Sequence, residues 1–250
     1  MLVAIFISGR INCYETDLLS CLHYLSQDSN IKIDLFCSIN GERTPYCEKA
    51  EAILSPWLRV IEYEVYKFPE NNYCSEGAYN VFSCFYNDRK NYKMILEYSQ
   101  KNEITYDYIC KFRSDILFPE NCSFKFPNIE QKNILYSCIP PDEIYFYGNK
   151  NLPRLICDAF AFGSPYVMEQ YCKTYDSILK DLLDTQGKHA VWFEPCLMES
   201  FLNITTSWQD NTFESDTAEK VTQAMLSSPF IIQYFECKYT LNPNRRLPRD

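Results

Sequence analysis

Tyr106-Asp-Tyr-Ile-Cys-Lys-Phe-Arg-Ser-Asp-Ile-Leu-Phe118 is the stretch that decides the fold. Its apolar residues predict a buried strand of an α/β protein. The charged residues Arg113 and Asp115 interrupt this run before it resumes at 116–118. Residues two apart in a strand face the same side, so we expect Arg113 and Asp115 to point together.

Two interpretations of this charged pair stay open on the residues alone. Burying an Arg and an Asp is costly unless the charges are paired with each other or bind something. An Arg beside a carboxylate at a strand end suits a diphosphate and its divalent metal ion. The alternative is an Arg113–Asp115 ion pair that only holds the structure together.

Strand and helix patterns alternate on both sides of this stretch. The alternation predicts one α/β domain over 1–250, with a mostly parallel central sheet flanked by helices on both faces. Further strands are expected at 2–8, 31–39, 60–65, 134–139 and 231–235, a short apolar segment at 158–162, and a loop at 69–75. Helices are expected at 17–26, 50–54, 79–100, 167–183 and 195–202.

Polar residues end several of the predicted strands, where α/β sheets bind their ligands. Ser8, Gly9 and Arg10 end the first strand, where Gly9 would let a ligand approach the backbone. The helix that follows could offer its N–H groups to an anion. Asn40 ends the second strand. The alternative at both places is an ordinary turn with a solvated Arg10.

Two more carboxylates lie beside apolar segments. Asp158 opens the stretch Asp-Ala-Phe-Ala-Phe-Gly163, and Glu194 follows Val-Trp-Phe and precedes Pro195. The place of Glu194, between an aromatic run and a helix start, fits a general base with a raised pKa, whereas Asp158 would lie against a close-packed wall of small and aromatic residues. Asp158 could equally cap a turn, and Glu194 could be a charge stabilised at the start of a helix.

Composition excludes several classes of protein. The 250 residues carry a net charge of −9 without a Lys/Arg-rich block, which argues against nucleic-acid binding. The 13 Cys are scattered without a C-x-x-C pair and only two His are present, so a structural zinc site is not expected. No apolar run is long enough for a membrane span or a secretory leader, which favours a reducing cytoplasm.

The order of the motifs resembles a known family. Phe-Ile-Ser-Gly-Arg10, Tyr86-Asn87, the Arg-Ser-Asp strand, Asp-Ala-Phe-Ala-Phe-Gly163 and Phe-Glu-Pro195 follow one another as in small GT-A-type nucleotide-sugar glycosyltransferases. Such enzymes occur in polysaccharide operons and in large DNA viruses. The resemblance extends from residue 1 to about residue 205 and is strongest at the Arg-Ser-Asp strand.

This resemblance implies a function and a division of the chain. Transfer of a sugar from a nucleotide-sugar donor to a glycan or glycoprotein hydroxyl is expected, with donor binding in 1–115 and acceptor binding in 116–250. The implied donor-binding residues are Ser8, Gly9, Arg10, Asn40, Tyr86, Asn87 and Arg113. The resemblance makes Asp158 or Glu194 the catalytic residue.

The metal motif of the family is incomplete here. Such enzymes carry an Asp-x-Asp that holds Mn²⁺ or Mg²⁺ against the donor diphosphate. Arg113 replaces the first Asp, so only Asp115 remains as a metal ligand, and Arg113 itself could neutralise the diphosphate. A nucleotide-sugar- or carbohydrate-binding module without catalysis therefore stays open as an alternative. A nucleotidyltransferase or methyltransferase would need a Gly-rich phosphate loop, which a chain with six Gly does not show.

Overall fold

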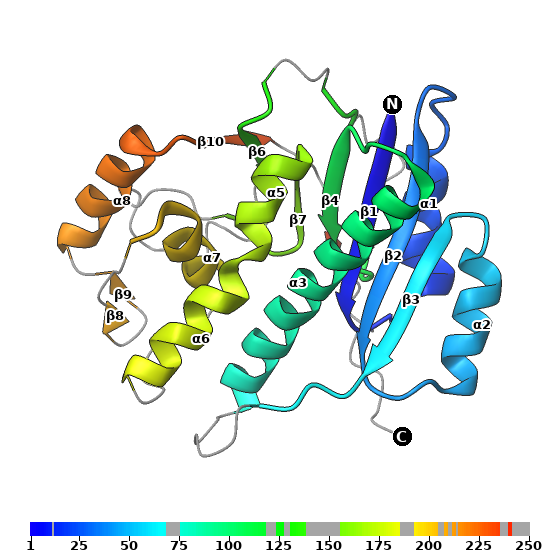
Figure 1. Cartoon of the computed structure of the whole chain (residues 1–250), viewed down its shortest axis with the longest axis horizontal. Helices are drawn as coiled ribbons and strands as arrows, with labels where there is room; N and C mark the ends of the chain where they lie inside the picture. The colour runs from blue at the N-terminus through cyan, green and yellow to red at the C-terminus, as the bar shows by residue number, and fades with distance from the viewer. Residues whose placement is uncertain are drawn as a thin grey trace.

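The fold is a seven-stranded sheet covered by helices (Figure 1). The computed structural model describes residues 1–11, 13–68, 76–118, 124–127, 131–138, 156–185, 193–204, 208–209, 212–213, 215–235 and 240–241. The elements follow in the order β1 (Leu2–Gly9), η1 (Tyr14–Leu18), α1 (Leu19–Leu25), β2 (Lys32–Asn40), α2 (Pro45–Leu54), β3 (Leu58–Glu64), α3 (Glu76–Asn102), β4 (Tyr108–Phe112), β5 (Ile116–Leu117), β6 (Ile134–Cys138), β7 (Phe160–Gly163), α5 (Pro165–Cys172), α6 (Thr174–Thr185), α7 (Phe193–Leu202), β8 (Trp208–Gln209), β9 (Thr212–Phe213), α8 (Ser215–Ser227), β10 (Ile231–Phe235) and β11 (Thr240–Leu241).

The strand order is β10-β6-β7-β4-β1-β2-β3, which places β4 at the centre. Strands β1, β2, β3 and β4 run parallel to their neighbours in this group, and β10 runs parallel to β6. Strand β7 is antiparallel to both β4 and β6. The predicted α/β class with a mostly parallel sheet is therefore confirmed, with one reversed strand beside the central one.

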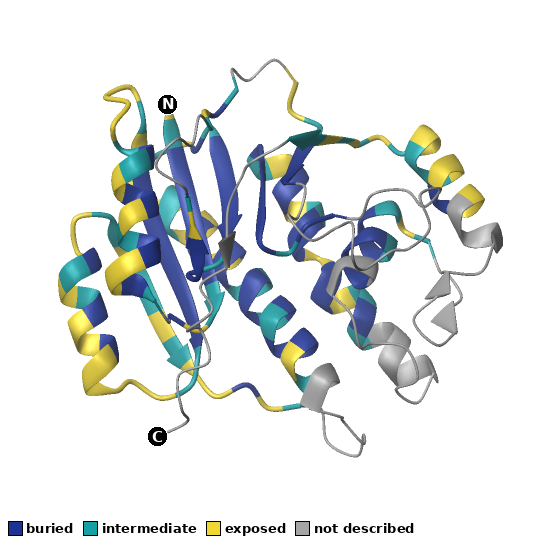
Figure 2. Ribbon diagram, turned by 180° about the vertical axis from the view of Figure 1, so that it is seen from behind, coloured by how far each residue is buried: buried dark blue, intermediate teal, exposed yellow. Residues whose placement is uncertain are grey.

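Apolar side chains fill both faces of the sheet, as a parallel strand with two buried faces requires. In β1, Ala4 and Phe6 pack toward α3 and the α5–α7 helices, while Val3, Ile5 and Ile7 pack toward α1 and α2. Figure 2 shows the second face from behind, with exposed outer surfaces on two helices over buried strands. The prediction of helices on both faces is confirmed.

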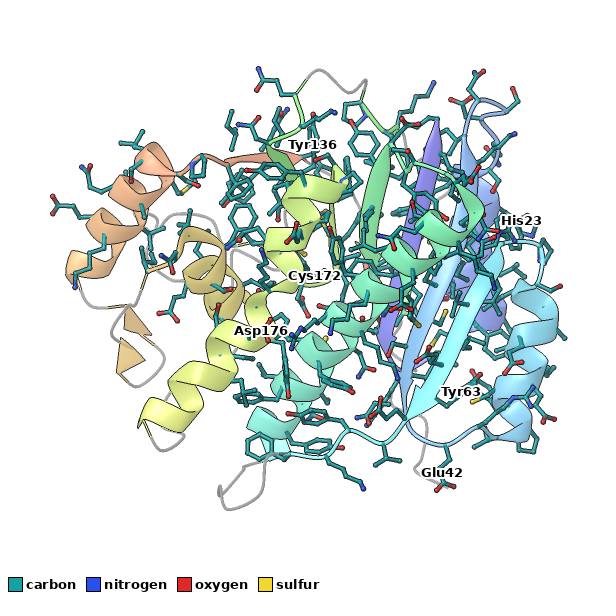
Figure 3. The ribbon with its side chains drawn as sticks, viewed as in Figure 1. His23, Glu42, Tyr63, Tyr136, Cys172 and Asp176 are labelled. Atoms are coloured by element: carbon teal, nitrogen blue, oxygen red, sulfur yellow. The ribbon has the colours of Figure 1, made fainter. Side chains whose placement is uncertain are left out.

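Side chains fill the space between the sheet and its covering helices (Figure 3). At the outer end of this layer, Asp176 of α6 forms an ion pair with Arg89 of α3 at 2.5 Å. The guanidinium of Arg89 also lies 6.0 Å from the ring centroid of Tyr175. These contacts join α6 to the long helix that lies over the centre of the sheet.

Local sequence explains where two helices begin. The hydroxyl of Thr44 accepts a hydrogen bond from the amide of Cys47 at 3.4 Å, and Pro45 is the first residue of α2. Ser164 does the same for the amide of Val167 at the start of α5. Both starts combine an N-cap hydroxyl with a proline that has no amide hydrogen to satisfy.

Gly163 allows β7, β6 and α5 to approach closely. A Cβ atom at this position would lie 2.2 Å from Cγ1 of Val167 and 2.9 Å from the carbonyl oxygen of Ile134. Both distances are shorter than van der Waals contact, so any side chain here would force the helix and the strand apart. The glycine at the end of the predicted apolar segment is therefore required by packing.

Several predicted boundaries were wrong. The helix expected at 167–183 is two helices, α5 and α6, which meet at Lys173, where the Thr174 hydroxyl donates to the carbonyl of Tyr171 at 2.8 Å. Helix α3 begins at Glu76, and α8 and the short strands β5, β8, β9 and β11 were not predicted. The loop expected at 69–75 and residue 139 lie outside the described residues. None of the helices in the described part of the chain is long and apolar enough to cross a membrane.

Candidate functional site

The candidate site lies at the edge where β1 and β4 end and β7 begins. Because β7 is antiparallel to β4, its first residues share an edge with the carboxyl end of β4, and Phe112 pairs with Phe160. The amide of Arg113 then donates to the carbonyl of Ala159 at 3.0 Å. This arrangement brings Asp158 beside Arg113, two predicted residues that are 45 positions apart in the sequence.

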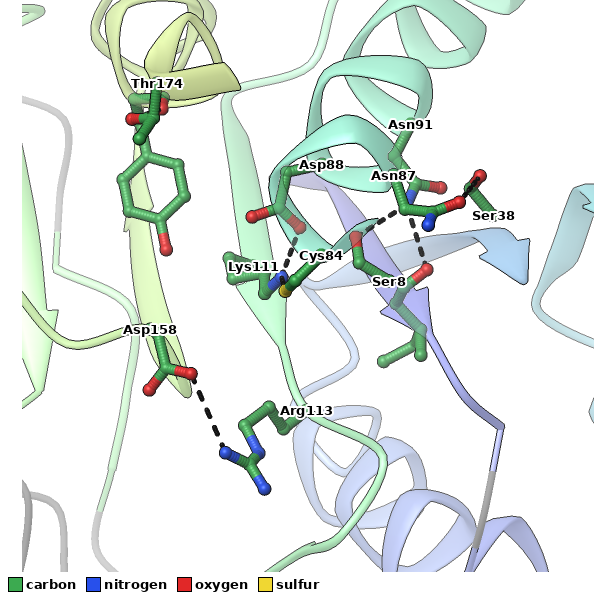
Figure 4. A network of polar contacts seen from close by, with 12 residues as sticks. Ser8, Ser38, Cys84, Asn87, Asp88, Asn91, Lys111, Arg113, Asp158 and Thr174 are labelled. Carbon is green, nitrogen blue, oxygen red and sulfur yellow. Dashed lines mark hydrogen bonds and ion pairs between the residues drawn. The ribbon is translucent and has the colours of Figure 1, made fainter. Parts of the chain in front are cut away.

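Arg113 pairs with two carboxylates, and Figure 4 shows its ion pair with Asp158. Its Nε and Nη2 atoms donate to the two oxygens of Asp115 at 2.9 and 2.8 Å. Its Nη1 atom lies 3.7 Å from Oδ2 of Asp158, which is longer than a hydrogen bond. Burial alone would lower the pKa of Arg113, but its hydrogen bonds to Asp115 and the charge of Asp158 raise it above its ordinary value.

The predicted contact between Arg113 and Asp115 is confirmed, but the predicted strand geometry is wrong. Strand β4 ends at Phe112, and residues 113–115 form a turn in which the amide of Ile116 donates to the carbonyl of Arg113 at 3.3 Å. The chain turns here because the pairing of β4 with β7 ends at Phe112. The hydroxyl of Ser114 donates to the carbonyl of Arg10 at 3.0 Å and ties this turn to the end of β1.

The first strand ends as the sequence predicts, and the helix after it begins with acidic residues. Gly9 has a φ of +86°, which glycine adopts without strain, and Arg10 is exposed. The next helical turn, η1, carries Glu15 and Asp17 among its first residues. Acidic side chains already occupy the positive end of the helix dipole, so they disfavour a bound anion there. These acidic residues weigh against the expectation that this helix offers its N–H groups to an anion, which stays a prediction.

The other residues assigned to donor binding lie around α3. Asn40 is the last residue of β2, and its Oδ1 accepts a hydrogen bond from the amide of Tyr66 at 2.8 Å. The hydroxyl of Tyr86 donates to the carboxylate of Glu64 at 3.0 Å. Asn87 is 1% exposed. Its burial leaves it almost no surface for a ligand, which favours a structural role in this conformation.

Asn87 belongs to a buried polar layer between α3 and the sheet. Its Oδ1 accepts from the hydroxyl of Ser38 at 2.5 Å, and its Nδ2 donates to the carbonyl of Ser83 at 2.6 Å. Nearby, Nδ2 of Asn91 donates to the hydroxyl oxygen of Ser8 at 3.0 Å and to the carbonyl of Ile7 at 2.9 Å. The hydrogen bond from Asn91 therefore fixes the side chain of Ser8 against α3.

A second charged pair, which the sequence analysis missed, lies in the same layer. Lys111 of β4 and Asp88 of α3 form an ion pair and are each 1% exposed. The ammonium of Lys111 also lies 3.6 Å from the sulfur of Cys84. Burial alone would lower the pKa of Lys111, but the carboxylate of Asp88 raises it overall. The signal in the sequence was a lysine inside the apolar run Tyr-Ile-Cys-Lys-Phe112.

Glu194 is the second residue of α7, a position consistent with a charge at a helix start. Its side chain lies outside the described part of the structure, so its relation to Asp158 stays a prediction.

A divalent cation at this site would depend on Asp115. Both oxygens of Asp115 accept hydrogen bonds from Arg113. Within the described residues, no group of three or more His, Cys, Asp or Glu side chains is suited to hold a metal ion. Mg²⁺ is commonly held by one or two carboxylates together with substrate phosphates. The residues therefore fit a cation only if a diphosphate shares it and draws Arg113 away from Asp115.

The comparisons with known proteins add no family to this geometry. The chain matches no protein-family model, and no curated protein matches it. The contacts of Arg113, Asp115 and Asp158 carry the functional argument.

Proposed function

We propose that this protein is a glycosyltransferase that moves a sugar from a nucleotide-sugar donor to a hydroxyl group of a glycan or glycoprotein, in glycan biosynthesis. The observation that supports it is the meeting of Arg113, Asp115 and Asp158 at the carboxyl end of the central strand. Ligands of α/β sheets bind at this edge. Two carboxylates around one guanidinium provide both a phosphate-binding group and a base.

Arg113 is the group that contacts the donor diphosphate in this proposal. Glycosyl transfer requires stabilisation of the negative charge that develops on the leaving diphosphate. The guanidinium fork matches phosphate oxygens in the same way as it now matches the two oxygens of Asp115. A diphosphate that binds here competes with Asp115 for Arg113. Mn²⁺ or Mg²⁺, held by Asp115 and the diphosphate, would supply further positive charge.

Asp158 and Glu194 remain the two candidates for the catalytic residue. An inverting transfer needs a carboxylate that accepts the proton of the acceptor hydroxyl. Asp158 lies beside Arg113 at 3.7 Å, within reach of a sugar bound to the same diphosphate. In a retaining enzyme neither residue need be a base, and Asp158 would orient the donor sugar or the acceptor.

We place the donor nucleoside over the end of β1. The position of a Cβ atom on Gly9 would meet no atom within 4 Å, so the backbone is open to a ligand there. Arg10 is exposed beside it. A cytoplasmic location is also part of the proposal, and the ten cysteines in the described residues carry free thiols, as a reducing compartment favours.

A calorimetric screen of nucleotide sugars, with Mn²⁺ and with a chelator, tests this proposal together with an assay of donor hydrolysis and transfer. Binding of a ligand to the native state also raises the unfolding temperature. We expect one nucleotide sugar to bind and to be turned over. Binding without any turnover would favour the alternative, a binding module without catalysis. If no nucleotide sugar or nucleoside diphosphate binds, the proposal is wrong.

The matched control for this screen is an Arg pair outside the site. Arg43 donates to both oxygens of Glu51 at 2.8 Å and so forms a bidentate pair like that of Arg113. Replacing Arg43 by Lys should leave donor binding unchanged, whereas Arg113→Lys should weaken it, because a point charge cannot replace the fork.

A further inference from the structure

One hydrogen bond joins the two chain segments that the proposed function assigns to the two parts of the donor. The hydroxyl of Ser114, in the turn that carries Arg113 and Asp115, donates to the carbonyl of Arg10 at 3.0 Å. Arg10 directly follows β1, over which we place the nucleoside. Strands β1 and β4 are parallel neighbours, so both segments lie at the same edge of the sheet (Figure 1). The bond therefore bridges the ends of two strands.

The end of β1 is fixed on its own side of this bond. Gly9 has a φ of +86°, and the amide of Arg10 donates to the carbonyl of Ser8 at 3.2 Å, which makes a three-residue γ-turn. The next residue, Ile11, is buried in the apolar core on the α1 face of the sheet. Arg10 is thus held between a γ-turn and a buried side chain, and its carbonyl is a fixed acceptor for Ser114.

The turn on the other side of the bond is held at its two ends. The amide of Arg113 donates to the carbonyl of Ala159 at 3.0 Å, and the amide of Ile116 closes the turn on the carbonyl of Arg113 at 3.3 Å. Ser114 is a central residue of this turn and is buried. A serine in a turn often bonds to its own neighbouring backbone. Here the hydroxyl reaches the end of β1 instead, so it fixes the place of the turn and not its shape.

We propose that Ser114 is a positioning residue of the donor site, a role that rests on the proposed function. Its hydrogen bond sets the position of Arg113, which contacts the diphosphate, relative to the end of β1, which contacts the nucleoside. A ligand whose two parts match this spacing binds both segments at once, without the cost of ordering one segment against the other. Without the bond, each segment keeps its own contacts, but the spacing between the two is no longer fixed.

The expected effect is specific for the intact ligand. Ser114→Ala should weaken the binding of a nucleoside diphosphate about tenfold, within the range of coupling between groups in contact. The affinities for its separate parts, the nucleoside and inorganic pyrophosphate, should change by less than about twofold, because neither part contacts both segments. Damage to the fold would weaken the binding of all three ligands together, so the pattern distinguishes positioning from a loss of structure.

Titrations of the whole protein with UDP, GDP and dTDP, with their nucleosides and with inorganic pyrophosphate measure this pattern. Ser114→Thr keeps the hydroxyl and should restore most of the affinity for the nucleoside diphosphate. The control is Ser26→Ala, which removes a hydroxyl that donates to the carbonyl of Leu22 at 2.7 Å, ahead of the start of β2. This control should keep the affinity of the wild type, because Ser26 lies away from the carboxyl ends of the strands.

A second experiment needs no ligand. Amide hydrogen exchange in the segments 8–11 and 113–116 should be faster in Ser114→Ala than in the wild type, because the bond that holds the two segments together is lost. Ser26→Ala should leave exchange in both segments unchanged. Unchanged exchange in Ser114→Ala would show that the bond does not hold the segments, which overturns the inference whether or not the protein binds a nucleotide.

The combined outcomes separate the inference from the proposed function. If Ser114→Ala exchanges faster but binds the nucleoside diphosphate as the wild type does, or loses affinity for all ligands equally, Ser114 only holds the fold and the inference is overturned. If the wild type binds none of the nucleoside diphosphates, the proposed function is wrong and the positioning role is overturned with it, even where exchange is faster. If Ser114→Ala does not fold, Ser114→Cys, which has a similar shape but a weak donor, replaces it in both experiments.

Discussion

Replacement of Asp115 by Asn should change diphosphate binding in opposite directions with and without a metal ion. In the structure, Asp115 holds Arg113 through two charge-assisted hydrogen bonds of 2.9 and 2.8 Å. A diphosphate must break both to reach the guanidinium. Asparagine keeps the size of the side chain but removes its charge. A diphosphate can then displace residue 115 from the guanidinium of Arg113 more easily. In a chelator, the variant should therefore bind a nucleoside diphosphate more tightly than the wild type.

The magnitude follows from the contacts that are lost. Hydrogen bonds to charged groups contribute about 1.5–3 kcal/mol each. The Arg113 side chain is 33% exposed, so solvent screening reduces this value, and asparagine still accepts one hydrogen bond. We expect the free energy of diphosphate binding to Asp115→Asn to be more favourable by about 1.4 kcal/mol, which corresponds to roughly a tenfold gain in affinity. With Mn²⁺ present the order should reverse, because Asp115 is the carboxylate that would hold the cation.

Calorimetric titration of a nucleoside diphosphate, in a chelator and in Mn²⁺, measures both predicted changes in affinity. Glu51→Gln is the control, since it alters the matched bidentate pair of Arg43 outside the site. Transfer by Asp115→Asn should fall at least about a hundredfold, as for the loss of one charge-stabilising group in a transition state. A folded variant that binds the diphosphate more weakly than the wild type in the chelator would refute the competition between Asp115 and phosphate. Near-normal turnover would remove Asp115 from the site.

Three further predictions address the site and the fold. Arg113→Lys should lose donor affinity by about tenfold or more, because Lys cannot form the bidentate contact, and full activity would show that the fork is not used. Of Asp158→Asn and Glu194→Gln, the variant that loses the base should bind donor normally but lose turnover, while normal rates in both would exclude them from the mechanism. Gly163→Ala should lower the free energy of unfolding by about 2–3 kcal/mol in denaturant titrations, since the added Cβ would lie 2.2 Å from Val167; a change below about 0.5 kcal/mol would contradict the packing argument.

The sequence was sufficient to predict the elements that carry the site. Continuous apolar runs marked β1, β2 and β4, and the rule that ligands bind at the carboxyl ends of strands brought Arg10 and Asp115 to one edge. The contact between Arg113 and Asp115 followed from the cost of burying either charge alone. These predictions succeeded because they depend on local pattern and on charge, which a single sequence contains.

The direction of β7 could not be read from the sequence. The apolar segment that contains Phe160 and Phe162 looks the same whether its strand runs parallel or antiparallel to its neighbours. The direction depends on the connection between β6 and β7, which gives no helical or strand signal that decides it. Yet this direction places Asp158 beside Arg113 at the same edge of the sheet, because an antiparallel strand begins where its neighbour β4 ends.

The buried pair and the turn after β4 were missed for a different reason. Whether Lys111 is paired depends on which face of α3 meets the sheet, and this is fixed by packing across about twenty residues of sequence separation. Likewise, apolar residues 116–118 continue the pattern of the strand, so nothing local marks Phe112 as its last residue. The last residue pair between β4 and β7 is Phe112 with Phe160, so the end of β4 depends on a strand that lies far along the chain.

The balance of charge at this edge distinguishes the two proposed functions, glycosyl transfer and the binding of a nucleotide sugar without catalysis. One guanidinium faces two carboxylates, so Arg113, Asp115 and Asp158 together carry a net negative charge. A diphosphate is also negative and cannot bind well unless positive charge is added or a carboxylate is displaced. A divalent cation would add that charge and would make Asp115 part of the reaction, as catalysis requires. Displacement of Asp115 by the phosphate alone would allow binding but would leave less positive charge to stabilise the leaving group. The dependence of affinity on Mn²⁺ therefore bears on whether this chain is an enzyme as well as on what it binds.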